Sequence, residues 1–341
     1  MTRTKPSIGR VTAAIVTIAA MLPYLTLKIL WMAGNPLGLD PAFVDDPTVV
    51  ALNAMTFGMD AVGLVMALAF TMRWGMRLPA WLVLLPLWVG TGLLSVIVVT
   101  APLGVLVEGA DVLPDAGPIQ PWVIMVVYSG FVVQGVGLMV SFALYARDRW
   151  PHVLTAPVAD RPLTSTLPFQ AVVARGALLF TLLIGGIRLA WAFGVSAGLP
   201  GVADDYSPSS ALLDGFKGLL AIGAGAALLA MVAGAGRAPF WKPLVVAWLG
   251  SGAMFGWGLY AMIVTVTGGP LGGNSPGLVG VVQLFETLTG LVMGMCGAFL
   301  LAERSRRAAG GSGGRHVQAA EHALEGEDRE GDRAPADHGH R

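Results

Sequence analysis

Six ionisable side chains interrupt the long apolar runs of this sequence. Three are basic and three are acidic, so their formal charges balance. A charge inside an apolar environment needs an opposite charge, hydrogen bonds or water, because its insertion costs at least about 2.5–3.5 kcal/mol. These residues therefore either pair to hold helices together or line a path for a small solute or ion. They are Lys28, Asp60, Arg188, Asp214, Lys217 and Glu286.

Lys28 and Arg188 occur in matching contexts, because a tryptophan follows each of them three residues later, as Trp31 and Trp191. Each cation is predicted near one end of an apolar helix. Two interpretations are open. The two cations extend to the membrane surface beside a tryptophan belt, or they face a cavity that is open to the outside and can hold a carboxylate or a phosphate.

Asp60 lies about twelve residues into its apolar run, which is roughly 18 Å at 1.5 Å per residue and therefore near the centre of a membrane. An acidic side chain at that depth cannot reach the surface. It either makes a structural polar contact, for which Lys28 is the nearest cation by depth, or contributes to a proton or ion pathway.

Asp214 and Lys217 are three residues apart, so they share a helix face and are predicted to pair locally. Glu286 is predicted at a depth similar to that of Lys217, and we expect these two residues to form a salt bridge between helices. Asp214 and Lys217 are thus candidates for structural ion pairs. The candidate residues of a solute or ion pathway are Lys28, Asp60, Arg188 and Glu286.

Motifs for catalysis and cofactor binding are missing from the sequence. No apolar run contains a histidine that could hold a haem, and no HExxH, GxSxG, Walker A or dinucleotide-binding glycine pattern occurs. The single cysteine, Cys296, excludes a disulfide within the chain and a cysteine-rich metal site. We therefore expect no catalytic residue, no metal, no cofactor and no nucleic-acid partner.

The composition predicts a membrane protein. Hydrophobic residues make up 55% of the chain and charged residues 12%, whereas a soluble domain is about 25% charged. Unbroken runs of about 20 apolar residues predict membrane-spanning helices rather than barrel strands. The sequence therefore predicts an all-α polytopic transmembrane helix bundle with eight spans, at residues 11–33, 48–72, 80–104, 121–146, 172–195, 210–233, 243–267 and 277–302.

The distribution of charge predicts the orientation of these spans. Lysines and arginines outside the spans lie in the N-terminal tail, in the loops after the second, fourth and sixth spans, and in the C-terminal tail, whereas the four other loops contain only acidic charges. Because short cytoplasmic loops carry the positive excess, we expect a multi-pass protein of the cell membrane with both termini in the cytoplasm.

The two halves of the membrane region resemble each other at an offset of 160 residues. Lys28–Gly34 aligns with Arg188–Gly194, and Gly92 aligns with Gly252. We therefore predict two tandem four-helix repeats, at residues 11–146 and 172–302, joined by a cytoplasmic linker at 147–171. Residues 1–10 are predicted to form a cytoplasmic N-tail. Residues 303–341, rich in Gly and mixed charge and free of aromatics, are predicted to form a disordered cytoplasmic tail.

The eight-span pattern with its duplicated Lys/Arg-x-x-Trp element resembles uncharacterised multi-pass membrane proteins of GC-rich actinobacteria, and that resemblance implies no particular activity. Our leading hypothesis is a non-enzymatic protein, in contact with the lipid bilayer, that moves or senses a small solute or ion between its two repeats. The alternative is a membrane scaffold or assembly subunit that binds a membrane protein partner or a second copy of itself. An intramembrane enzyme without a recognisable motif ranks third.

Overall fold

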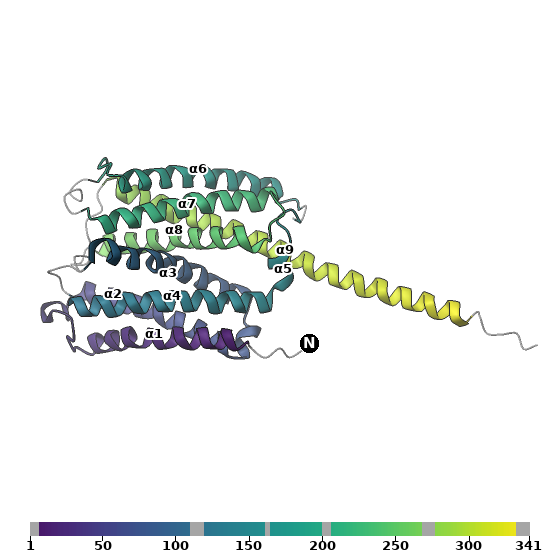
Figure 1. The fold of residues 1–341 in the computed structure, drawn as a ribbon, viewed down its shortest axis with the longest axis horizontal. Coiled ribbons are helices and arrows are strands. Elements are labelled where there is room, and N and C mark those ends of the chain that lie inside the picture. The colour runs from purple at the N-terminus through teal and green to yellow at the C-terminus, as the bar shows by residue number, and fades with distance from the viewer. Residues whose placement is uncertain (1–6, 110–118, 161–163, 200–205, 268–276, 332–341) are drawn as a thin grey trace, which may run out of the picture.

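Eight long helices form a bundle in the computed structural model, which describes residues 7–109, 119–160, 164–199, 206–267 and 277–331, with side chains to residue 307 (Figure 1). All eight are long and apolar enough to span a membrane, which confirms the predicted spans. Three short helices accompany them: η1 (Pro41–Phe43), η2 (Trp74–Arg77) and α5 (Pro151–Thr155). The long helices are α1 (Ile8–Met32), α2 (Pro47–Thr71), α3 (Ala80–Glu108), α4 (Pro121–Arg149), α6 (Leu167–Ala192), α7 (Pro208–Ala233), α8 (Trp241–Thr267) and α9 (Leu278–Gly331).

Local sequence signals set where α2 and α7 begin. Asp46 precedes α2, and its carboxylate accepts hydrogen bonds from the backbone N–H groups of Thr48 and Val49 at 2.8 and 3.1 Å. Ser207 precedes α7 and accepts in the same way from Ser210 at 3.2 Å. A proline follows each cap at the first helical position, where its missing N–H costs nothing.

We call helices α1–α4 the first unit and helices α6–α9 the second unit, and α3 packs against α8 and α7 as well as against α4 and α2. In the first unit α1 packs mainly against α4 and α2, and in the second α6 packs mainly against α7. Figure 1 shows the two units side by side, with the chain beginning and α9 leaving the bundle at the same end. We call this the N-terminal end, and the end that carries residues 33–46 the opposite end.

Close contact between α3 and α8 joins the two units, and we call it the seam. A Cβ atom added to Gly92 would clash with the backbone of Gly252, and one added to Gly252 would clash with the backbone of Trp88. The two backbones can approach this closely only because both positions lack a side chain. The two tandem four-helix repeats expected from the sequence stay a prediction, because helix packing alone does not establish a repeat.

The outward faces of the bundle carry large apolar side chains, such as Leu179, Leu183 and Val266, which are 67%, 61% and 85% exposed. A surface of this kind is stable only in an apolar solvent. The protein is therefore an integral membrane protein whose helices contact the lipid bilayer.

Helix α9 continues to Gly331, although the sequence predicts that helical structure ends near residue 302 and that a disordered tail follows. Figure 1 shows the extension leaving the bundle as a single helix. The membrane-spanning part supplies the costly first turn, so the segment that follows adds residues to an existing helix, although its glycines are poor helix formers. The structure therefore differs from the predicted disordered tail for the backbone up to Gly331, and residues 332–341 lie outside the described part of the chain.

Arg304 of α9 holds the segment before α6 at the N-terminal end of the bundle. Its guanidinium donates hydrogen bonds to the carbonyl oxygens of Pro157 and Val158 at 3.4 and 2.8 Å and lies 3.9 Å from the centre of the Phe240 ring. We expect Arg304→Met to lower the free energy of unfolding by about 1–3 kcal/mol, because it leaves buried carbonyl groups without donors. Thermal unfolding in detergent would measure this. Arg306→Met, at an exposed position on the same helix, is the control, and an equal effect of both variants would contradict the assignment.

Candidate functional site

A buried ammonium group lies inside the first unit. Lys28, on α1 and only 1% exposed, donates hydrogen bonds to Thr56 and, at 3.4 Å, to the Asn53 side-chain oxygen, both on α2. Its Nζ atom also lies 4.2 Å from the centre of the Tyr24 ring. Every one of these partners is formally neutral, so no anion among the described residues is in direct contact with the Lys28 ammonium group.

A buried carboxylate lies one helical turn deeper on the same face of α2. Asp60 is 7% exposed and accepts a hydrogen bond from the Gln134 side chain of α4 at 3.4 Å. Four residues separate Asp60 from Thr56, a rise of about 6 Å along the helix. Among the described residues no cation lies within 4.0 Å of the Asp60 carboxylate. The first unit thus holds one positive and one negative group that do not form an ion pair.

The second unit contains a closed network of charges. Arg188, on α6, pairs with Glu286 of α9 through two nitrogens, and the NH2–Oε2 distance is 2.7 Å. A third guanidinium nitrogen pairs with Asp214 of α7. Such paired contacts match the planar guanidinium to the carboxylate, which makes them strong and directional.

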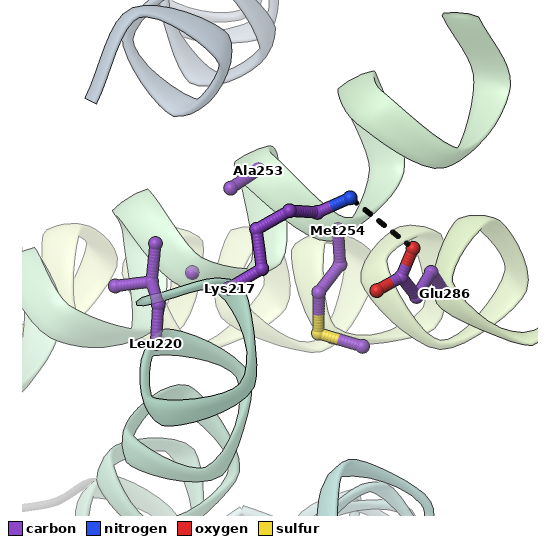
Figure 2. Close-up of a pocket in the computed structure, with 6 residues that line it drawn as sticks. Lys217, Leu220, Ala253, Met254 and Glu286 are labelled. Carbon is purple, nitrogen blue, oxygen red and sulfur yellow. Dashed lines mark ion pairs between the residues drawn. The ribbon is translucent and has the colours of Figure 1, made fainter. Parts of the chain in front are cut away.

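Lys217 and Tyr206 complete this network. Lys217, on α7, reaches Glu286 at 3.7 Å, and Figure 2 shows its side chain extending past Met254 toward the carboxylate. The narrow pocket around this pair has no room for a water molecule. Tyr206, just before α7, donates a hydrogen bond to Asp214 at 2.9 Å. Burial and the nearby carboxylate raise the pKa of the Tyr206 hydroxyl above its usual range, so it stays a donor.

The two clusters occupy corresponding places in their units. Counted from the proline that begins each helix, Asn53 in α2 and Asp214 in α7 both stand six residues further on. Lys28 contacts Asn53, and Arg188 contacts Asp214. The same position therefore carries a neutral amide in the first unit and a carboxylate in the second. Because of this difference, Arg188 has an anionic partner at this position and Lys28 does not.

The structure decides between the interpretations that the sequence left open. Lys28 and Arg188 are 1% and 6% exposed, so neither extends to the membrane surface and that explanation is wrong. The expected ion pair between Lys217 and Glu286 is present. The expected local pair of Asp214 and Lys217 is not, because the guanidinium of Arg188 lies between helices α7 and α9 and takes the Asp214 carboxylate.

The candidate pathway residues do not meet at the seam. Lys28 and Asp60 lie within the first unit, and Arg188 and Glu286 lie within the second. The seam instead contains glycines, tryptophans and hydroxyl groups in close contact. The sequence led us to expect a pathway between the two units. Among the described side chains, however, the seam contains no charged residue that could line one.

Sequence reasoning missed five polar residues of the two clusters. Asn53, Thr56 and Asp60 are spaced three and four residues apart, which places them on one face of α2, and this spacing is a signal that could have been used. Tyr24 is likewise four residues before Lys28, whereas Gln134 and Tyr206 give no such signal, because one stands alone in an apolar run and the other lies near a helix start. The five are Tyr24, Asn53, Thr56, Gln134 and Tyr206.

These observations define a multi-pass helical membrane protein with two buried polar clusters, one closed and one open. The described residues include no group of three or more His, Cys, Asp or Glu side chains that could hold a metal ion. Comparisons with protein families, with curated proteins and with solved structures gave no match.

Proposed function

We propose that this protein moves or senses a small cation, with protons as the first candidate, through its first unit, and that Asp60 is the group that binds it. The proposal depends on one observation: the buried carboxylate of Asp60 has no cation in contact among the described residues, whereas both carboxylates of the Arg188 network, Asp214 and Glu286, are paired. A buried carboxylate without a partner is costly, so a proton or cation from solution would stabilise it.

Lys28 gives the site its second property. Its ammonium group contacts Thr56, one helical turn from Asp60 on α2, and favours the charged carboxylate, which promotes release of a bound proton or cation. A conducting or sensing site requires a group that can both bind and release a proton or cation. The Arg188 network, with two cations and two anions in contact, has no such freedom, and we assign it a structural role.

Buried polar side chains continue from this site toward the N-terminal end of the first unit. Thr17 on α1 and Ser141 on α4 are both fully buried, and Arg10 pairs with Asp148 at 3.1 Å near the end of the bundle. Together with Lys28 they place polar groups at several depths of the first unit. This arrangement supports a path for protons within the unit.

Proton movement into liposomes tests the proposal. The purified full chain is reconstituted with a pH-sensitive dye trapped inside, and a potassium diffusion potential drives protons inward. We expect the wild-type protein to acidify the interior faster than protein-free liposomes, and Asp60→Asn to reduce the rate to that background. Asp45→Asn, the same chemical change at an exposed residue near the opposite end, should leave the rate unchanged.

The outcomes separate the hypotheses. If wild-type liposomes acidify no faster than empty ones, either with the potassium diffusion potential or with an outward sodium gradient as the driving force, the pathway is excluded. If Asp60→Asn retains the wild-type rate, Asp60 is not the binding group. The extension of α9 beyond the bundle favours a scaffold as the second candidate, in which a partner binds residues 308–331. A scaffold would show no flux and would lose its partner when residues 308–341 are removed.

We also propose that the N-terminal end faces the cytoplasm of the cell membrane. The positions at this end include Arg10, Arg77, Arg149 and Lys242, whereas residues 33–46 at the opposite end contain no basic residue. Positive residues are retained on the cytoplasmic side during insertion.

A further inference from the structure

Two hydrogen bonds across the seam are reciprocal. Trp88 Nε1 of α3 donates to Ser251 Oγ of α8 at 2.9 Å, and Trp248 Nε1 of α8 donates to Thr91 Oγ1 of α3 at 3.0 Å. Trp88 and Trp248 are 160 positions apart in the sequence, and so are Thr91 and Ser251. Each helix therefore gives the other the same donor and the same acceptor, which is the pattern of a two-fold interface.

The closest backbone contact of the seam follows the same rule. Gly92 and Gly252 are also 160 positions apart, and they face each other where α3 and α8 cross. Three of the pairs that touch across the seam are separated by 157, 160 and 163 positions, and the hydrogen bond from Trp257 to the Leu93 carbonyl spans 164, so the separation stays close to 160. Constant separation means that the two helices run in the same direction, so the axis relating them is parallel to the helices, as in repeats related by an axis along the membrane normal.

The seam tryptophans also contact the opposite unit in a matching way. The Trp88 ring lies where a Cβ atom on Gly294 of α9 would stand, and the Trp248 ring lies 5.5 Å from the Phe142 ring of α4. Each tryptophan thus crosses from the third helix of its own unit to the fourth helix of the other. Such an exchange is expected when two equivalent surfaces bind each other.

Turns far from the seam repeat with the same offset. The Trp31 ring nitrogen donates to the Leu37 carbonyl at 2.8 Å, and that of Trp191 donates to the Ala197 carbonyl at 3.0 Å. The φ angles of Gly34 and Gly194 are 81° and 89°. Because few residues adopt this left-handed conformation, two such turns at the same offset support a common origin of the two units.

We propose that this chain is a fused pair of four-helix protomers, and that the seam is a permanent docking surface by which each unit binds a second copy of its own kind. The proposal rests on the seam and the turns and does not require the proposed cation pathway. It also explains the two polar clusters, because equivalent sites in fused protomers can diverge. One site has kept neutral partners for Lys28, and the other has acquired carboxylates for Arg188.

Cleavage of the linker in the full chain tests this proposal. A protease recognition sequence is inserted between residues 162 and 163, and the purified protein is cut in a mild detergent and separated by size. After the cut only non-covalent contacts hold the fragments together, and we expect them to co-elute. Gly92→Leu and Gly252→Leu should each weaken the association by about tenfold or more, since each forces the two backbones apart.

The control is Gly90→Leu, because a Cβ atom added at this neighbouring position of α3 meets no atom within 4 Å. The milder variants Trp88→Phe and Trp248→Phe each remove one of the reciprocal hydrogen bonds and should weaken the association equally. The proposal is overturned if Gly92→Leu and Gly252→Leu release the fragments no more than Gly90→Leu does. It is also overturned if one tryptophan variant weakens the association and the other does not.

Discussion

Arg188→Met is expected to lower the free energy of unfolding by about 3–5 kcal/mol, because it leaves two buried carboxylates with a single ammonium group. Arg188 contacts both Glu286 and Asp214, and Glu286 is only 1% exposed. The arginine therefore connects α6 with both α7 and α9. Unfolding in mixed micelles with increasing SDS would measure the change.

Two further variants make this result specific. Arg147→Met removes an arginine whose side chain is 62% exposed, and it should change stability by less than about 1 kcal/mol. Asp214→Asn added to Arg188→Met leaves one lysine and one glutamate in the cluster, so charge balance returns and part of the stability should be recovered. An Arg188→Met protein as stable as the wild type would show that the network contributes nothing to the fold.

Asn53→Asp is expected to give Lys28 an ion-pair partner and to slow proton uptake into liposomes by at least about tenfold. A tenfold slower rate corresponds to an activation free energy higher by roughly 1.4 kcal/mol. The Asn53 side-chain oxygen lies 3.4 Å from Lys28 Nζ, so an aspartate there would form the ion pair that Arg188 makes with Asp214. Lys28 would then stabilise this new carboxylate instead of promoting release from Asp60.

Asn53→Leu is the matched control for this prediction. It removes the same hydrogen bonds, including the 3.2 Å bond from the Asn53 amide to the Lys28 carbonyl, but adds no charge. We expect it to lower stability while retaining proton uptake. If Asn53→Asp conducts at the wild-type rate while remaining folded, charge balance around Lys28 does not control the pathway.

Most of the secondary structure follows from the sequence alone. Eight apolar runs of sufficient length predict eight helices, because a chain in lipid has to satisfy its own backbone hydrogen bonds. Asp46 with Pro47 and Ser207 with Pro208 predict two helix starts by their chemistry. The continuation of α9 to Gly331 was missed, since composition does not reveal that a helix is already formed on one side of the segment.

The sequence also identified the charged residues of both clusters, but it predicted only one of their pairings correctly, that of Lys217 with Glu286. Charges in apolar runs are conspicuous because each is costly in lipid. Which charges pair depends on how each helix is rotated about its axis and on which helices are neighbours. Neither property can be derived from a single sequence. Asp214 therefore appeared to pair with Lys217 three residues away, whereas the fold brings Arg188 from another helix into contact with it.

By itself the sequence determined that this protein lies in a membrane, how many spans it has and which buried residues carry charge, because these properties depend on local composition and length. Only the tertiary structure decided that the charges form two separate clusters, that Arg188 is paired while Lys28 is not, and that α3 meets α8 through Gly92 and Gly252. The physical reason is that contacts between helices depend on how each helix is rotated about its axis and on how closely the helices pack. Both are set jointly by residues that lie far apart in the chain.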